Sequence, residues 1–366
     1  MKAICARKDL YHGVQTVSRA ISGRNAWPIL NNILVQTEEG FLRLTAFDLE
    51  LGIECVIPAT IISEGALTVP SRQFSEMLAA FPEADVMISD DEQNVINIKC
   101  EKSDYSLLGL PAEEFRPLPE IPDGRSFELP QNVFKDVIRQ TIFAVSTDES
   151  RAILTGVLMT LTGDELKFAG TDSHRMAVKT ALANNASGEA SCIIPKRAFD
   201  EVARLLLDED APVSVSVADS QIKFIVNGVE IVSRLIEGQF PNFERIIPTE
   251  FERKLTIPTD IFLMSVKRAS ILARENSNRI YLKTVGDQLI VTAESGDVGK
   301  AYEELEIVKE GEDIDIVFNV KYLLDFLVAA GSEGVFMELK GPLETAVMKQ
   351  VGRDDYLYVL MPMHLV

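Results

Sequence analysis

An aspartate, a serine and a histidine stand side by side in the segment GTDSHRMA, residues 170–177. Asp172, Ser173 and His174 are the residue types of a serine hydrolase, in which the histidine takes the serine proton and the carboxylate orients the histidine. Such a triad must converge on one point, whereas successive side chains of a strand point to opposite faces. Since no G-x-S-x-G turn presents a serine either, we expect a strand end here and no catalytic residue.

Other chemistry is equally unsupported by the sequence. The four cysteines are scattered singly with no C-x-x-C pair, which indicates free thiols rather than a zinc site or a disulfide framework. No phosphate-binding loop and no cluster with metal-ligand spacing is present. We therefore expect a protein that is not an enzyme and that needs no metal and no organic cofactor.

Length and composition set the broad class. A chain of 366 residues favours two to three domains, and 46% hydrophobic with 25% charged residues is typical of a soluble globular protein. The N-terminal MKAICARKDL lacks the apolar segment of a signal peptide, and no apolar run approaches about 18 residues. We expect a cytoplasmic protein. The net charge of −20 argues by itself against nucleic acid, but a ligand responds to the local field rather than to the sum.

One pattern occurs three times along the chain. Helical segments with an apolar stripe are predicted at 6–22, 129–146 and 257–273, with Leu10, Phe134 and Phe262 in matching places. Pro130 and Pro258 stand where a first-turn proline belongs. Two alternating strands joined by a glycine-containing turn follow each helix, which indicates a hairpin. A second helix comes later in each copy, at 69–82, 194–210 and 318–333, and further hairpins follow it.

These repeats predict three domains of one design. Segments rich in proline and charge at 120–130 and 247–258 suggest linkers, and we place the domains at 1–122, 123–252 and 253–366. Each domain holds two helices and several antiparallel strands, so the fold class is α+β.

The helical segments differ from the rest of the chain in charge. Counted over 7–22, 71–81, 130–145, 195–207, 258–274 and 319–330, they carry roughly 13 Lys and Arg against about 7 Asp and Glu, which leaves 23 basic and 49 acidic residues elsewhere (36 − 13 and 56 − 7). One interpretation is that these are simply solvated helix faces. The other is that all six helices offer one common surface to phosphates, in which case binding would be non-specific and salt-dependent, because aromatic residues for base stacking are absent.

The three copies, together with TDSHRMA, GQFPNFERIIP at 238–248 and the terminal YVLMPMHL, closely resemble the bacterial DNA polymerase III β sliding clamps over the full length. The resemblance implies a head-to-tail homodimer closed into a ring around duplex DNA. Such a clamp is a processivity factor of DNA replication that tethers the replicative polymerase, the clamp loader and repair proteins. It would act in the bacterial cytoplasm, at the nucleoid during replication. The alternative is an acidic β-rich interaction scaffold that does not encircle DNA.

The resemblance also implies site residues. A hydrophobic pocket for partner peptides would comprise Arg151, Leu154, Thr171, His174, Arg175, Met176, Pro241, Arg245, Ile246, Leu343, Thr345, Val359, Met361, Pro362, Met363 and Leu365. DNA contacts would come from Arg24, Arg72, Lys196 and Arg197, and the dimer interface from Tyr105, Leu107, Ile271 and Leu272. Ser173 and Met176 replace the Gly and Leu that are usual in this motif, and His364 replaces a usual Arg. The apolar groups of the pocket are kept.

Overall fold

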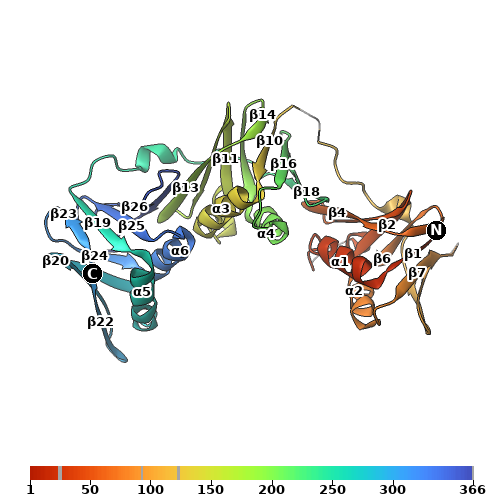
Figure 1. Ribbon diagram of the computed structural model, residues 1–366, viewed down its shortest axis with the longest axis horizontal. Coiled ribbons are helices and arrows are strands. Elements are labelled where there is room, and N and C mark those ends of the chain that lie inside the picture. The colour runs from red at the N-terminus through yellow and green to blue at the C-terminus, as the bar shows by residue number, and fades with distance from the viewer. Residues whose placement is uncertain (24–26, 92–93, 122–123, 365–366) are drawn as a thin grey trace. The chain divides into compact units, whose positions relative to one another are not determined.

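The computed structural model describes residues 1–23, 27–91, 94–121 and 124–364. No helix in these ranges is long and apolar enough to cross a membrane. The chain forms two compact units. The first consists of Met1–Gln131, Asn185–Ser187 and Arg197–Leu235, and the second of Asn132–Asn184, Gly188–Lys196 and Ile236–Val366. The colours of Figure 1 follow the chain through both units.

The first unit holds two antiparallel sheets, in the strand orders β5-β1-β7-β8-β9 and β14-β10-β16-β17-β18-β4-β3-β2-β6. Its helices are α1 (Arg7–Ser18), α2 (Ser71–Ala80), α4 (Lys196–Leu205) and the short turns η1 (Pro28–Asn31) and η2 (Ala112–Glu114). Its strands are β1 (Lys2–Ala6), β2 (Asn32–Glu38), β3 (Phe41–Phe47), β4 (Leu51–Pro58), β5 (Thr60–Ser63), β6 (Ala66–Pro70), β7 (Asp85–Asp90), β8 (Val95–Cys100), β9 (Ser103–Leu108), β10 (Ser126–Pro130), β14 (Asn184–Ser187), β16 (Pro212–Val217), β17 (Gln221–Val226) and β18 (Val229–Arg234).

The second unit also holds two antiparallel sheets, in the orders β15-β11-β12-β13-β27-β26-β25-β19-β23 and β22-β21-β20-β24. Its helices are α3 (Gln131–Thr141), α5 (Thr259–Ala273), α6 (Val320–Ala330) and the turns η3 (Ile142–Ala144), η4 (Glu149–Leu154) and η5 (Phe243–Ile246). Its strands are β11 (Gly156–Thr162), β12 (Glu165–Thr171), β13 (Arg175–Leu182), β15 (Ala190–Pro195), β19 (Arg253–Pro258), β20 (Arg279–Val285), β21 (Gln288–Ser295), β22 (Gly299–Glu306), β23 (Val308–Glu310), β24 (Asp315–Asn319), β25 (Gly334–Leu339), β26 (Ala346–Gln350) and β27 (Tyr356–Leu360).

Prolines mark where four strands give way to helices. Pro70, Pro130, Pro195 and Pro258 each end a strand, and a helix begins at the next residue. The prediction that Pro130 and Pro258 lie in the first helical turn is therefore wrong by one residue. Pro258 is the N-cap, with φ −60° and ψ 124°. The proline ring fixes only φ, near a value that extended and helical backbone share, and the ψ angle here keeps the residue extended.

The local predictions of helices and hairpins are confirmed. A helix occupies each of the six predicted segments, and each first helix is followed by a hairpin: β2–β3, β11–β12 and β20–β21. Gly40, Gly163 and Gly286 take positive φ in the turns of these hairpins, as tight turns require. In the first unit α1 and α2 lie side by side under the strands (Figure 1), and the Ser18 and Ser71 hydroxyls are 2.8 Å apart.

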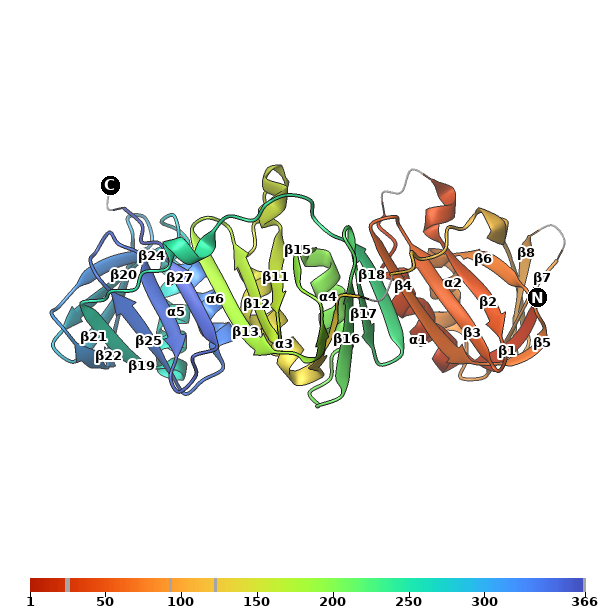
Figure 2. The same cartoon turned by 90° about the horizontal axis from the view of Figure 1, so that it is seen from above.

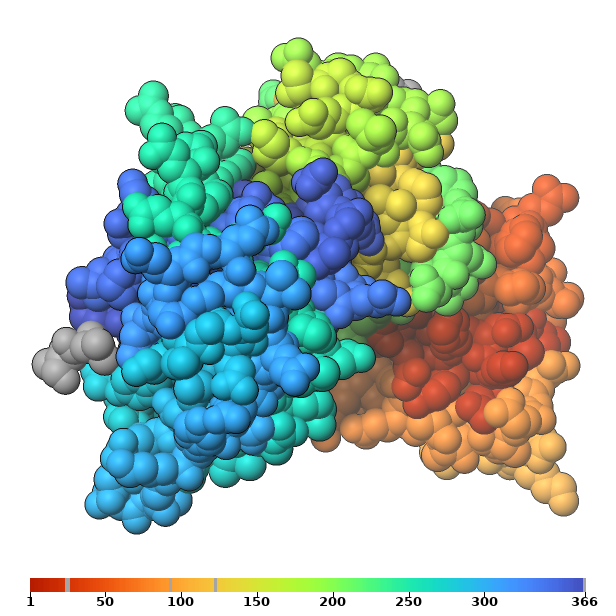
Figure 3. All heavy atoms as spheres, turned by 60° about the vertical axis from the view of Figure 1, so that its left-hand side comes forward, coloured from red at the N-terminus to blue at the C-terminus, as the bar shows by residue number. Residues whose placement is uncertain are grey.

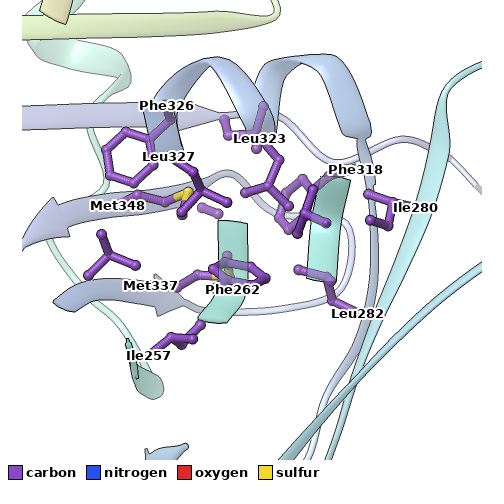
Figure 4. Close-up of a cluster of buried hydrophobic side chains, with 14 of the residues drawn as sticks. Ile257, Phe262, Ile280, Leu282, Phe318, Leu323, Phe326, Leu327, Met337 and Met348 are labelled. Carbon is purple, nitrogen blue, oxygen red and sulfur yellow. The ribbon is translucent and has the colours of Figure 1, made fainter. Parts of the chain in front are cut away.

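The core of the third repeat shows how two helices close one side of the sheets. Figure 4 shows Phe262 of α5 and Leu323 and Phe326 of α6 directed into a cluster with side chains of β20, β25 and β26. All three are fully buried. Replacing such a buried phenylalanine by alanine costs about 3–5 kcal/mol. This core also contains Tyr356 and Tyr358 of β27, and it thereby fixes the strand that leads into the C-terminal segment.

Both large sheets run from one repeat into the next. In the first unit β18 pairs with β4, with Ile231 opposite Ile53, and in the second β27 pairs with β13, with Tyr358 opposite Ala177. Figure 2 shows β27 lying beside β13. Neighbouring repeats are therefore joined by backbone hydrogen bonds between strands as well as by the connecting chain.

Candidate functional site

The segment around Ser173 is a tight turn between two strands. Strand β12 ends at Thr171 and β13 begins at Arg175. The Asp172 carboxylate accepts the backbone N–H groups of His174 and Arg175 at 2.9 and 3.1 Å. The Thr171 hydroxyl donates to the Arg175 carbonyl at 2.6 Å and accepts the Ser173 N–H at 3.1 Å. Ser173 has a φ of +79°, a conformation that short polar side chains tolerate in turns.

The expected strand end is found at Thr171, where β12 ends, whereas residues 172–174 lie in the turn that follows and not in a strand. The three residues lie in the turn because Asp172 satisfies amides that would otherwise pair along a strand. They still form no triad, since the second carboxylate oxygen of Asp172 accepts from Arg175 at 3.0 Å rather than from His174. The Ser173 hydroxyl accepts a hydrogen bond from Arg151 at 3.4 Å, and among the described residues no hydrogen bond joins it to the His174 ring.

Arg175 is a buried structural cation of the site and has only 6% of its surface exposed. Its guanidinium donates to Asp172, to Asp325 of α6 at 2.5 Å and to the Phe143 carbonyl at 2.6 Å, and it lies 4.3 Å from the centre of the Tyr322 ring. Burial lowers the pKa of Arg175, but Tyr358 and the two carboxylates outweigh it and the net shift is upward. Arg175 therefore fixes the turn against α6, and its donors are already engaged.

A cavity of about 240 Å³ opens beside this turn. Its lining comes from the β12–β13 turn, from η5, from β27 and from the loop before β26. The residues are Thr171, Ser173, His174, Arg175, Met176, Ile246, Thr345, Val359 and Met361. Two of these apolar side chains are exposed: Ile246 of η5 and Met361 of the chain after β27. Figure 2 shows η5 beside β13. The cavity offers apolar walls to a side chain that enters from solvent.

Half of the sixteen residues expected at a peptide pocket line this cavity: Thr171, His174, Arg175, Met176, Ile246, Thr345, Val359 and Met361. Ser173 was missed by the sequence reasoning, which followed the family motif at a position where glycine is usual. Leu154 is buried, Arg151 bonds to Ser173, and Arg245 and Leu343 are exposed. Pro241 lines a different groove, and Leu365 lies outside the described residues.

The C-terminal segment is held against the protein by backbone hydrogen bonds of Met361 and Met363. The Met361 N–H donates to the His174 carbonyl at 3.0 Å, and the Met363 N–H donates to the Val317 carbonyl at 2.8 Å. Pro362 is half-buried between these two hydrogen bonds. The first bond ties the chain after β27 to the turn at 172–174, which holds Met361 at the cavity.

The residues expected to contact DNA differ in their surroundings. Arg72 is exposed on α2 and pairs with Glu76 at 3.0 Å. Lys196 is the first residue of α4, and Arg24 lies outside the described residues. Arg197 donates to the Asp48 carboxylate at 2.6 Å and to the Ala20 carbonyl at 2.8 Å. Arg197 thus neutralises a buried aspartate and caps the end of α1.

The residues expected at a dimer interface are surface residues of edge elements. Tyr105 and Leu107 belong to β9, an edge strand of its sheet, and Tyr105 is exposed. Ile271 of α5 is 68% exposed, and Leu272 is half-buried.

Neither cysteine chemistry nor a metal centre is visible in the described part of the chain. All four cysteines are buried and free, and burial raises the pKa of Cys5 and of Cys55 to about 12, with nearby carboxylates adding to the shift. Such thiols stay protonated and unreactive. No group of three or more His, Cys, Asp or Glu residues in the described ranges could hold a metal ion.

Three tandem α+β repeats, joined edge to edge by their sheets and carrying an apolar cleft on the second, define a clamp-type fold. Three family descriptions match in order: DNA polymerase III beta subunit, N-terminal domain at residues 1–119, central domain at 128–242 and C-terminal domain at 244–364. The chain belongs to the family of bacterial DNA polymerase III beta subunits, the beta sliding clamps.

Relatives and solved structures agree over the whole length. The chain is 33% identical to the beta sliding clamp of Synechocystis sp. over 390 residues, with all of both chains covered, and 34% identical to that of Staphylococcus aureus with 94% of each covered. The DNA polymerase sliding clamp of Bacillus subtilis superposes with a TM-score of 0.96 at 30% identity, with both chains fully covered. A Pseudomonas aeruginosa sliding clamp bound to griselimycin gives 0.94 at 29% identity, again with full coverage. The function of this chain is that of a DNA sliding clamp, a processivity factor of DNA replication.

Proposed function

We propose that two copies of this chain close head to tail into a ring around duplex DNA, and that the ring is not an enzyme but a tether for proteins carrying a short apolar peptide. Those proteins are the replicative polymerase, the clamp loader and repair proteins. The observation that supports the ring is the way the sheets join consecutive repeats. An edge strand of one repeat pairs with an edge strand of the next at two places within the chain, and one such edge strand in the first repeat and one in the third have no partner strand in the described residues.

The unused edge of the third repeat is β22. The hairpins β3–β4, β12–β13 and β21–β22 are equivalent in the three repeats. In each hairpin the first residue of the first strand lies opposite the last residue of the second strand. Strands β4 and β13 are each covered by a strand of the following repeat. Strand β22 pairs only with β21 in the described chain, and the β21–β22 hairpin projects from its unit in Figure 1 and Figure 3. An open edge strand invites pairing with another chain.

The unused edge of the first repeat is β9. It ends a hairpin with a two-residue turn, Cys100 opposite Ser103, as β18 ends one with Val226 opposite Val229. Strand β18 covers the preceding repeat's β4. Strand β9 would cover β22 of a second copy in the same way, because in the described residues it is an edge strand that pairs only with β8.

The register proposed for the joint between copies follows the two joints within the chain. Ile231 lies opposite Ile53 in the first joint and Tyr358 opposite Ala177 in the second. The matching residues at the open edges are Tyr105 and Ala301, so these two would face each other across the joint between copies. Leu107 would then lie opposite Gly299, near Ile271 and Leu272, since α5 packs on β22. Two such joints close a ring of six repeats.

The cavity beside His174 is the proposed peptide site. Ile246 and Met361 provide exposed apolar walls, and a methionine can repack around partners of different shape. Arg151 and Arg245 are exposed and could hold peptide carbonyls or acidic side chains. Leu154, Pro241, Leu343, Pro362, Met363 and Leu365 complete the proposed surroundings of the site. Arg24, Arg72, Lys196 and Arg197 are the proposed phosphate contacts, and Arg197 also donates to the Asp48 carboxylate.

Topological retention tests the ring. The protein is assembled on nicked circular duplex by chemical crosslinking of the open joint, which bypasses a loader, and passed through a sizing column. Protein should stay with the circle and leave once a restriction enzyme linearises it. Equal loss from circle and linear DNA would contradict encirclement, and equal retention on both would indicate ordinary binding. The alternative, an acidic interaction scaffold that does not encircle DNA, predicts that the protein is retained on neither the circular nor the linear duplex.

A further inference from the structure

A second groove, of about 360 Å³, lies on the same outer sheet face as the cavity. Its floor is formed by side chains of β11 and β12, among them Leu158, Thr160 and Lys167, and its wall is the segment 240–244. Thr160 lies opposite Lys167 and Thr162 opposite Glu165 in the register of these strands, so the floor is a ladder of cross-strand pairs. None of the floor residues is among those expected at the peptide pocket.

The groove and the cavity share a dividing wall. Phe243 is buried against Met176 and Val359, which line the cavity, while Leu158 and Phe240 at the groove pack on the same cluster. The turn η5 (Phe243–Ile246) forms the ridge between them, since Glu244 lines the groove and Ile246 lines the cavity. A four-residue turn of this kind is about 8 Å long at about 2.0 Å per residue. Two or three residues of extended chain cross that distance at about 3.3 Å each.

The groove carries polar groups that have no partner among the described residues. Thr160, Thr162, Glu165 and Asn242 make no side-chain hydrogen bond or ion pair with any described residue. Lys167 is already paired with Glu244 at 2.6 Å, across the groove. One lysine against two glutamates leaves a net charge of −1 (1 − 2), and the uncompensated carboxylate is Glu165. Hydroxyls, an amide and one carboxylate beside the Phe240 ring suit an extended polar peptide with a basic side chain.

We infer that this groove binds the residues that flank the apolar anchor of a partner peptide, with a lysine or arginine of the flank pairing with Glu165. The inference rests on the proposed function of the neighbouring cavity as the anchor site. Three observations support one peptide that spans the cavity and the groove. The two share a wall, two or three residues of extended chain are enough to cross it, and the groove has a negative charge. Partners with the same anchor would then differ in affinity according to the sequence beside it.

Fluorescence anisotropy with three labelled peptides tests this. The first is a hexapeptide with a leucine and a phenylalanine anchor, and the other two carry five further residues, one of them arginine, at the N- or the C-terminus. One extension should bind five- to tenfold more tightly than the hexapeptide, and the gain should disappear when its arginine is replaced by glutamate. Equal affinity of all three peptides would overturn the inference.

Charge reversal makes the test specific to the groove. Glu165→Lys changes an exposed side chain that has no partner in the described ranges, and it should leave the hexapeptide affinity unchanged while transferring the gain to the glutamate-containing extension. Glu189→Lys is the matched control, since it alters net charge equally at an exposed position outside both cavities. A gain that survives Glu165→Lys refutes the role of Glu165. Failure of the hexapeptide to bind the unaltered protein would instead refute the anchor site itself.

Discussion

The apolar walls of the cavity allow a quantitative prediction for partner binding. We expect the double replacement Ile246→Ala with Met361→Ala to weaken an anchor peptide without unfolding the chain. Both side chains are exposed, at 59% and 48%, so removing them leaves no hole in the core. Fully burying such a side chain contributes about 1.5–3 kcal/mol. Scaled by the exposed fractions, the peptide gains roughly 0.7–1.8 kcal/mol from covering each residue.

Together the two replacements should cost about 2 kcal/mol of binding free energy, which corresponds to roughly a thirtyfold rise in Kd. Anisotropy titration with the labelled leucine–phenylalanine hexapeptide measures this directly. Denaturant unfolding should give the same midpoint for the variant and the unaltered chain, because only exposed side chains change.

The matched control is Leu182→Ala with Val308→Ala, which removes comparable exposed apolar groups that line neither cavity. This control should bind the hexapeptide as the unaltered chain does. A double cavity variant that kept its affinity within twofold would refute the reasoning, since the two most exposed apolar walls would then contribute nothing. An equal loss in the control would point to a general effect of surface hydrophobicity.

Three further predictions concern the ring, the DNA and the fold. Replacing Ile271 and Leu272 together by alanine should give folded monomers, and sedimentation that still shows a dimer at micromolar concentration would contradict the proposed joint. If Arg72 contacts one phosphate, Arg72→Gln should reduce the slope of log K for duplex binding against log salt concentration by about 0.9. An unchanged slope would show that Arg72 does not contact DNA. Burial raises the pKa of Asp355, but bonds from its basic neighbours, including the buried Lys179, outweigh it, so its folded pKa is lowered. Its stabilisation should therefore be present above pH 4 and lost as the pH falls through the folded pKa. Asp355→Asn should cost about 2 kcal/mol near pH 7, discounted for partial exposure, and urea titrations should show this difference shrinking in acid.

Features set by local periodicity could be predicted from the sequence. The six helices follow from apolar residues at helical spacing, and the hairpins follow from alternation and a glycine that takes positive φ. The proline positions were off by one residue because φ alone does not separate a strand end from a helix start. The domain limits at 122 and 252 stay a prediction.

Features that depend on distant partners could not be predicted. The pairing of β13 with β27 joins segments about 180 residues apart, and nothing in either strand marks the other as its neighbour. Arg175 was expected to face the peptide, whereas Asp325 and the Phe143 carbonyl hold it in the interior. Ser173 lines the cavity because it lies in a turn with positive φ, a conformation that the sequence pattern did not indicate.

The repeats also explain why a cleft is found on the second copy. Asp48 and Asp172 occupy the same turn: each accepts two backbone N–H groups, each precedes a residue with φ near +78° and each pairs with an arginine. The turn alone therefore does not make a cleft. In the first copy Phe115 and Leu118, from the segment leading to the second repeat, pack beside Phe47 and Leu49 at this turn. In the second copy the corresponding turn is lined by Ile246, from the segment leading to the third repeat, and by Met361, from the chain after β27. The shared turn is thus supplied by the repeat, and the side chains that the crossing segments bring to it, with η5 between them, set the cavity and the groove of the second copy.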